Sequence, residues 1–503
     1  MRKFSALSKW TPKTVVSIVV LTTLSACAVT PTPLTQTDVQ SAASDRKARY
    51  IPKDQVPVTG AIGLHEAMAR ALKYKLDRKI EIAKLQMRSS QLDISKMEML
   101  PQFVASSEFS KRDNDPGSYS VNLGTGSQST TASRSVDRES QSSDLTISWN
   151  VLDFGLSYYR AQQAANNALI ASEEKRAVTN RLLEDVRTAY WRAASAQRLE
   201  GRLAKLLNRA ERALSDSRAL SDDGQSDPLI NLKYQRDMLR LIVEIKGLRR
   251  DLDVAKRQLA ALINVPPNQT IRVRTNDYAT PPSLKISASQ LVDLALLNRP
   301  ELREISYEMR NLELDKKSAA LGMLPSISPF VTASASTNDL LVNRDWMNAG
   351  VRVSWDLLGV ATQGRQTKFY KNSQALLDAR SLALTQAIAT QVHVAHARFG
   401  LLKDEVKAAR DYRNVSRKIA KTINDQAETG SAGNQDSVYE EMNTILAEMR
   451  YDTKFAELQN TYANLFSSIG LNMYPIADVE NIDLIQLKDQ IHATWQAMGE
   501  GIH

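Results

Sequence analysis

Paired histidines and clustered aspartates are the residues whose types and spacing come closest to a reactive site. His393 and His396 lie three residues apart on one predicted helix, but no cysteine or nearby carboxylate completes a zinc site. Asp222, Asp223 and Asp227 lack the alternating acids and the terminal glutamate of a calcium loop. We interpret both groups as solvated polar residues, and we expect no metal ion and no other cofactor.

Motifs for catalysis and for nucleic-acid binding are missing from the sequence as well. The chain has neither a glycine-rich phosphate loop nor the G-x-S-x-G of a hydrolase. Its 65 Lys and Arg outnumber 56 Asp and Glu, giving a formal charge of +9, but the basic residues are spread among acids without interleaved aromatics. We predict that the protein is not an enzyme and does not bind nucleic acid.

The single cysteine, Cys27, follows a segment with the order of a secretory signal peptide. Four basic residues within the first 13 positions precede a mostly apolar stretch at 15–24, which leads through two small residues to Cys27. We predict that residues 1–26 are removed. The sequence L-S-A-C resembles the bacterial lipoprotein signal, which implies that Cys27 is acylated and becomes the mature N-terminus. The alternative is that Cys27 is a buried structural cysteine. In either case a single cysteine forms no disulfide within the chain.

The elements that would position any functional residue come in two copies of one unit of roughly 200 residues. The sequence M-L-P at 99–101 recurs at 323–325 with an offset of 224, whereas the Ser-Trp pair at 148–149 recurs at 354–355 with an offset of 206. The first copy therefore carries 18 extra residues between these landmarks, which we interpret as a loop. Beyond them the offset of 206 holds without a gap, as expected for elements packed side by side.

These offsets predict how the chain is organised. An acylated and extended leader at 27–58, rich in Pro, Ser and Thr, precedes the first repeat at 59–265. A connector at 266–285 leads to the second repeat at 286–471, and a tail at 472–503 follows it. Each repeat is expected to contain a helix, two strands and a long helical hairpin.

Two runs of the sequence alternate strictly between apolar and polar residues. They cover 145–151 in the first copy and 351–357 in the second, and this period of two predicts strands with one apolar face. Trp149 and Trp355 lie on that face. We predict that they contact a membrane, where indoles partition, and the alternative is that they only fill the apolar face of the sheet.

Weaker runs supply one partner strand for each of these two. They cover 103–109 and 327–333, and Pro329 in the second run predicts a sheet edge or a bulge, because proline lacks the N–H that a central strand donates. The joining segments at 111–143 and 337–348 are rich in Ser, Gly, Asp and Asn and are expected to be solvated loops.

Long helices account for most of the remaining sequence. With 19 Gly and 16 Pro the chain has few turns, and apolar residues keep a three-four spacing over 182–214 and again over 234–262. This predicts a helical hairpin whose first helix covers 156–221, a rod of about 100 Å. Gly224 and Gly430 lie in polar segments that interrupt the pattern, so we expect both hairpins to end at one pole.

The predicted fold is therefore mainly α-helical with a small β part, built of duplicated helical hairpins and four strands. After residue 26 no apolar run reaches the roughly 18 residues of a transmembrane helix, so any membrane crossing would use the strands. Four strands cannot close a barrel, and lipid tolerates no open sheet edge, so we expect several copies to assemble. Three copies would supply twelve strands, a number found in outer-membrane barrels.

The order of these motifs resembles the TolC-type outer-membrane factor family over about residues 59–471. The resemblance rests on R-P-E-L at 299–302, the Leu-Pro pairs at 100–101 and 324–325, the Ser-Trp strands, and the glycine-bearing tips. It implies a homotrimer in a Gram-negative bacterium, with a twelve-stranded β-barrel in outer-membrane lipid and a long periplasmic α-barrel. It also implies docking on a periplasmic adaptor and an inner-membrane pump, driven by protons or by ATP, so that the protein would be a passive efflux duct.

The resemblance further implies a gate at the helical tips. In that family the tips pack inward and close the periplasmic entrance, in several members with aspartates beyond the tip glycine of the second copy. Asp436, six residues after Gly430, matches this position, and Gly224 and Asp227 belong to the tip of the first copy. The pattern is incomplete at two positions, where some members carry a basic residue and a second aspartate: Ala432 and Tyr439.

Two other functions remain open at the level of sequence. The first keeps the duct but changes its cargo, to type I secretion of a protein or export of a polysaccharide. The second is a lipidated periplasmic coiled-coil scaffold without a pore. Apolar strand faces argue against the scaffold, because a periplasmic scaffold has no use for Trp149 and Trp355 on alternating apolar positions.

Overall fold

The computed structural model describes residues 31–50, 55–222, 227–266, 269–275, 284, 286–361, 363–431, 433–471 and 479–501. The chain divides into two compact units, Met1–Gln55 and Val56–His503. Cys27 lies outside the described residues. Within the first unit the leader is not extended throughout as predicted, because α2 covers Gln36–Arg49. A capping box begins this helix, with Asp38 N donating to Thr35 Oγ1 and Thr35 N donating to Asp38 Oδ2.

The second unit contains the two copies, and the same elements recur in them at the offsets seen in the sequence. The elements of the first copy are α3 (Leu64–Tyr74), α4 (Leu76–Met97), β2 (Gln102–Lys111), β5 (Glu139–Ser148), α5 (Val151–Asp222) and α6 (Pro228–Leu262). Those of the second copy are α7 (Ala288–Asn298), α8 (Pro300–Leu321), β7 (Ser326–Ser336), β8 (Asp345–Ser354), α9 (Leu357–Ala361), α10 (Gln363–Glu428) and α11 (Asn434–Ser468). The mainly helical fold with long helices and four principal strands is confirmed.

The four strands form one antiparallel sheet in the order β2-β5-β7-β8. The prediction that Pro329 marks an edge or a bulge is wrong, since β7 pairs on both sides. Pro329 O accepts a hydrogen bond from Trp149 N at 3.1 Å. Because N–H and C=O of one antiparallel residue point to the same side, the missing donor of Pro329 faces the end of β5 and leaves the β7–β8 ladder intact.

The 18 extra residues of the first copy are more ordered than the predicted loop. Two short strands, β3 (Gly117–Ser118) and β4 (Ser133–Arg134), pair within this segment. The buried Asn338, from the corresponding loop of the second copy, ties the two loops together. Its Nδ2 donates to Ser135 O at 3.0 Å, and its Oδ1 accepts from Asp137 N at 3.1 Å.

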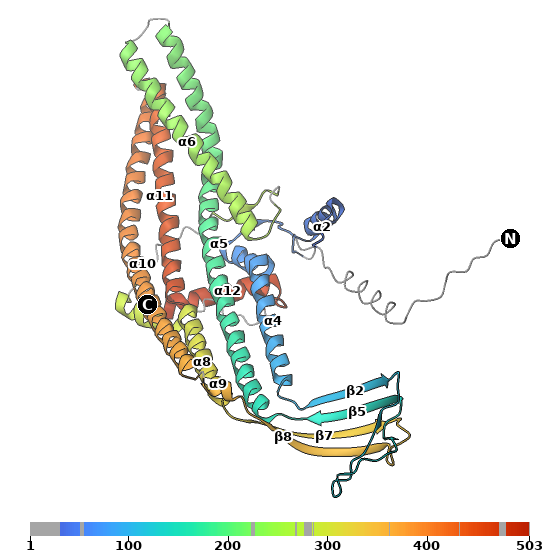
Figure 1. The fold of residues 1–503 in the computed structure, drawn as a ribbon. Helices are drawn as coiled ribbons and strands as arrows, with labels where there is room; N and C mark the ends of the chain where they lie inside the picture. The colour runs from blue at the N-terminus through green and yellow to red at the C-terminus, as the bar shows by residue number, and fades with distance from the viewer. Residues whose placement is uncertain are drawn as a thin grey trace, which may run out of the picture. The chain divides into compact units, whose positions relative to one another are not determined.

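The long helices pack into two antiparallel hairpins, α5–α6 and α10–α11, whose tips lie at the end away from the sheet (Figure 1). Helix α5 has 72 residues and covers Val151–Asp222, so it begins five residues before the predicted 156–221 and ends one residue after it. Near the tips α11 packs between α5 and α10, and nearer the sheet α8 does so. The second unit therefore has one lateral edge formed by α4, α6 and β2, and an opposite edge formed by α10 and β8.

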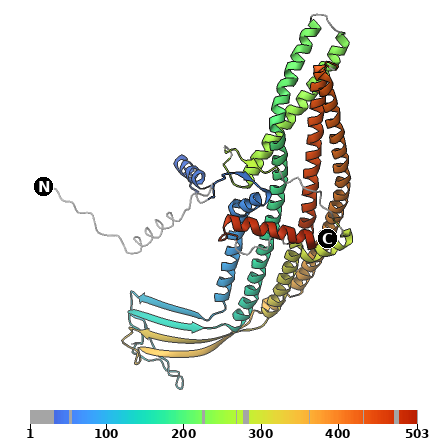
Figure 2. The ribbon, with the colours of Figure 1, turned by 180° about the vertical axis from the view of Figure 1, so that it is seen from behind.

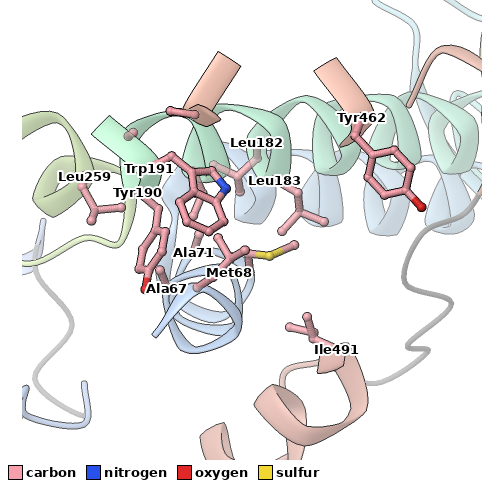
Figure 3. Packing of buried hydrophobic residues seen from close by; sticks show 14 of the residues in the cluster. Ala67, Met68, Ala71, Leu182, Leu183, Tyr190, Trp191, Leu259, Tyr462 and Ile491 are labelled. Carbon is pink, nitrogen blue, oxygen red and sulfur yellow. The ribbon is translucent and has the colours of Figure 1, made fainter. Parts of the chain in front are cut away.

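A hydrophobic core joins the hairpins at mid-height. Residues of α3, α5, α6, α11 and the C-terminal α12 (Leu484–Gly501) meet there, among them Met68, Leu183, Tyr190, Trp191 and Ile491 (Figure 3). Helix α12 crosses the hairpins instead of running along them (Figure 2). Its Trp495 packs against Tyr462 and Phe466 of α11, and the Arg187 guanidinium lies 3.9 Å from the centre of the Trp495 ring. The small parallel pair β1 (Ala61–Ile62) and β6 (Arg272–Val273) borders this core.

Each hairpin returns to the core through a residue in the left-handed conformation. In the first copy this is Asn264, with φ of 59°, and 206 residues later it is Gly470, with φ of 67°. Gly470 also lies close to the backbone of the R-P-E-L motif, since a Cβ added there would be 2.6 Å from Arg299 Cα. The chain reversal at Gly470 thus requires both a left-handed backbone and the absence of a side chain.

Replacing Gly470 with Ala is expected to destabilise the protein by more than about 2 kcal/mol, because left-handed strain of about 1–2 kcal/mol adds to a clash with backbone. Thermal unfolding followed by circular dichroism measures the change. Gly400→Ala is the matched control, since Gly400 lies within α10 and no atom comes within 4 Å of an added Cβ. A Gly470→Ala protein as stable as Gly400→Ala would contradict this account.

Candidate functional site

The apolar face of the sheet is exposed, which is the reverse of a water-soluble protein. Along β7 the exposed residues are apolar, and the residues between them are shielded and polar apart from Phe330. In β5 the exposed residues are apolar at Leu145 and Ile147 and polar over 139–143. Pairing aligns Phe103, Ile147, Val331 and Ala349 in one row across the four strands. Exposed fractions of the larger side chains in this row run from 42% to 65%. The second unit thus presents a contiguous apolar band on one face of its sheet.

The opposite face of the sheet is mostly polar, with Val104, Phe330 and Trp346 as its large apolar residues, and it contains side-chain hydrogen bonds between strands. Thr146 and Thr332 share a hydrogen bond of 2.9 Å between their hydroxyls. Ser334, which is buried, donates to Asp144 Oδ1 at 2.5 Å. A sheet with a mostly polar face and an exposed apolar band on the other face suits a wall between water and lipid.

The two predicted tryptophans lie just beyond the ends of the strands, where the sheet meets the helices. Trp149 is 41% exposed and packs edge-on against Phe154, with 5.4 Å between the ring centres. Trp355 is 56% exposed, and its Nε1 donates to Met323 O at 2.9 Å. Sequence reasoning missed Trp346, which lies on the polar face of β8, because its run lacks the strict alternation that flagged the other two.

At the tip of the second hairpin, Gly430 ends α10 with φ of 76°. Gly430 N donates to Ala427 O at 3.1 Å and Ser431 N donates to Gln426 O at 2.8 Å, the two bonds of a Schellman motif. At the other tip Asp227 caps α6, its Oδ1 accepting from Leu229 N at 2.8 Å. Gly224 and Ala432 lie outside the residues that the structure describes.

Asp436 lies in the first turn of α11 and is exposed. It comes close to groups of the first hairpin: burial raises the pKa of Tyr234 to about 12, and the carboxylates of Asp436 and Asp216 add to this shift. Tyr234 Oη is buried and has no hydrogen-bond partner within the described ranges. Tyr439, like Tyr234, packs against the apolar cluster between the hairpins, so it contributes packing at a position where an aspartate would contribute charge. The tip therefore brings Asp436 close to Tyr234 of the first hairpin, and among the described residues Asp436 forms no ion pair.

Both lateral edges of the second unit carry apolar residues at heptad spacing. On α4 these are Ile80, Met87 and Ile94, each more than half exposed. On α10 the stripe contains Leu401, Tyr412, Val415 and Ile419. Stripes of this kind are typical of helices that pack against another helix.

Neither membrane-spanning helices nor metal-ligand clusters occur in the described part of the chain. None of its helices combines the length and the apolar character needed to cross a bilayer. No three His, Cys, Asp or Glu side chains gather there in a way that could hold a metal ion, and His393 and His396 lie on α10 apart from such a group.

Comparison with known proteins gives a match at the level of structure. No protein-family model and no curated protein matches the sequence. The Campylobacter jejuni CmeC outer membrane channel superposes with a TM-score of 0.64 at 13% identity, over 85% of this chain and 89% of that chain. The outer-membrane channel OprN gives 0.62 at 15% identity, over 81% and 89%. The open state of the Neisseria gonorrhoeae MtrE outer membrane channel gives 0.61 at 16% identity, over 84% and 94%. The chain shares the fold of TolC-family channels.

Proposed function

We propose that the protein is the outer-membrane duct of a tripartite export system, carrying substrates from an inner-membrane pump and a periplasmic adaptor across the outer membrane. The observation that carries this proposal is the exposed apolar band on a sheet whose opposite face is mostly polar. An apolar band of this kind requires lipid or protein to cover it, because exposed apolar area is unfavourable in water. The fold shared with CmeC, OprN and MtrE supports the same function.

The two free edges of the sheet support assembly into a closed ring. With four antiparallel strands, β2 and β8 run in opposite directions, so β8 of one copy can pair antiparallel with β2 of the next copy. Each copy then uses two different surfaces, and such head-to-tail contacts close into rings. We propose three copies and twelve strands, the arrangement implied by the family resemblance.

In this duct each predicted site residue has a proposed role. Cys27 is acylated and anchors the N-terminus, while Trp149 and Trp355 lie at the interface between lipid and water. Asp436, Gly430, Asp227 and Gly224 form the periplasmic gate. The protein catalyses no reaction, and its partners supply the energy and the selectivity.

The alternatives differ in what the structure would have to explain. Secretion of a protein or a polysaccharide through a type I system uses the same duct, so only the partners distinguish it from drug or metal efflux. A scaffold without a pore leaves the apolar band unexplained, because a periplasmic scaffold would expose this band to water.

A lysine in the apolar band tests the proposed membrane wall. Val331→Lys should abolish stable insertion into the outer membrane, since a lysine facing lipid at mid-depth costs about 2–4 kcal/mol in each copy. Asn348→Lys is the control, because Asn348 lies on the polar face, one strand away. Membrane fractionation and resistance to extraction measure insertion. Equal insertion of both variants would contradict the membrane wall and favour the scaffold.

Removing the carboxylate of Asp436 tests the gate. In planar bilayers Asp436→Ala should weaken block by a polyvalent cation roughly tenfold, because a ring of carboxylates at the entrance attracts the blocker. Asp489→Ala, which removes an exposed carboxylate from α12, should leave block unchanged. Unchanged block in Asp436→Ala would exclude Asp436 from the gate.

Photo-crosslinking in cells tests the partners. Probes at Leu229 and Ile230, both exposed at the start of α6, should capture a periplasmic adaptor, whereas a probe at the exposed Ile485 of α12 should not. An adaptor of a proton-driven pump would establish efflux, and an adaptor of an ATP-driven transporter would establish secretion. No adaptor from efficiently incorporated probes would contradict docking at this pole.

A further inference from the structure

The repeat offset of 206 residues relates two helix faces that differ in exposure. The face of α11 that packs on α5 is buried inside the chain, whereas the equivalent face of α6 is exposed at the edge of the second unit. We call such a contact between two helix faces a seam. Helix α11 packs on α5 through Val438, Met442, Ile445 and Met449, all at most 3% exposed. Subtracting 206 gives Leu232, Arg236, Leu239 and Val243 on α6, and the three apolar members of this set are 42% to 70% exposed. The face of α6 that corresponds to the buried face of α11 therefore has no partner within the described chain.

The surface that would cover α6 is found by the same offset. The offset relates α11 to α6 and α5 to α10. Because α11 packs on α5, we expect the equivalent face of α6 to pack on the exposed stripe of α10 from another protomer. This stripe repeats every three or four residues and contains Leu401, Asp404, Ala408, Tyr412 and Val415. Helices α6 and α10 lie on opposite edges of the second unit, so they cannot contact each other within one protomer. The contact therefore requires α10 of a neighbouring protomer.

Charges at three equivalent positions identify the contact further. Inside the chain, Arg198 of α5 binds Asp452 of α11, which is fully buried, and Arg417 of α10 binds Glu448 of α11 at 2.8 Å. Arg198 and Asp452 form an ion pair with each other, whereas Arg417 pairs with Glu448, whose counterpart is Ile242. At the three positions compared, Arg198, Asp452 and Arg417 carry plus, minus and plus charges. Their counterparts 206 residues away are Asp404, Lys246 and Glu211, with charges minus, plus, minus.

Two of the three residues with reversed charge, Lys246 and Glu211, already form an ion pair in the single chain. Lys246 Nζ lies 2.9 Å from a carboxylate oxygen of Glu211 on the neighbouring α5. Asp404 is exposed on α10 and has no ion-pair partner among the residues that the structure describes. The counterpart of the internal ion pair between Arg198 and Asp452 is therefore a pair between Asp404 and Lys246, which a single chain cannot form.

We propose that α6 of one copy packs on α10 of the next copy through this seam, and that Lys246 of the first binds Asp404 of the second. This inference rests on the proposed ring of protomers, and it identifies the ion pair that determines which helix faces contact each other between protomers. The inverted charges prevent the two seams from exchanging partners. Exchange would place Lys246 against Arg198 and Asp404 against Asp452, and like charges placed together in an interface cost several kcal/mol.

Cysteine crosslinking in native membranes tests the contact directly, because the chain has only one natural cysteine. Lys246→Cys with Asp404→Cys, treated with a short bis-maleimide, should give a ladder of covalent oligomers on a denaturing gel. The matched control is Arg198→Cys with Asp452→Cys, the equivalent pair inside the chain, which should crosslink within the monomer and give no ladder. A chain with only Cys27 reports any background.

A second pair separates failure of this inference from failure of the proposed duct. Ser106→Cys on β2 with Asn348→Cys on β8, joined by a longer flexible linker, reports the ring through the sheet edges. A ladder from the sheet pair without one from Lys246 and Asp404 would overturn the proposed seam and keep the ring. Absence of both ladders would contradict the ring, and with it the proposed function.

Charge reversal tests whether the ion pair selects the partner. Asp404→Arg should lower the association constant of the oligomer roughly tenfold, since it faces Lys246 with a like charge. Adding Lys246→Asp and Glu211→Arg, which recreates the charge order of Arg198, Asp452 and Arg417, should restore association. A triple variant whose oligomer associates as weakly as that of Asp404→Arg would overturn the role of the ion pair. If a charge variant fails to fold, the crosslinking experiment still tests the contact.

Discussion

The two open edges of the sheet are the constraint on which the proposed assembly depends. In the duct that we propose, the apolar band faces lipid, and lipid offers no hydrogen bonds to the outward N–H and C=O groups of β2 and β8. In that environment other protomers must pair these edges. Helices α4, α6 and α10 carry apolar stripes along the same two edges, so the helical part presents matching surfaces for the same assembly.

Duplication explains how one short set of elements builds such a wall. The principal helices and strands of the two repeats correspond, apart from β3 and β4 in the first repeat and the division into α9 and α10 in the second. The contact between repeats inside a chain is therefore our template for the proposed contact between chains. The templates differ in charge, since Arg198 and Asp452 are replaced by Asp404 and Lys246. A duplicated chain gains from this difference, because two similar seams with equal charges would compete for the same surfaces.

Much of this fold could be predicted from the sequence, because long periodic patterns with few glycines and prolines dominate it. The period of two located β5 and β8, although both begin six residues before the predicted runs at 145–151 and 351–357 and end three residues before them. The hairpins followed from the period of three to four. Pro329 was misjudged, since periodicity does not reveal to which side a residue directs its missing N–H. The surroundings of Asp436 could not be predicted either, because Tyr234 and Asp216 belong to another hairpin and approach it only through packing.

The joined loops at the far end of the sheet have a consequence for recognition. Asn338 holds the copy-one hairpin and the copy-two loop together through Ser135 and Asp137 before any other molecule arrives. The conformational entropy of both segments is thus lost when the single chain folds. A molecule that binds this end meets two loops that are already joined, and its binding free energy is reduced less by loop ordering than it would be with separate loops.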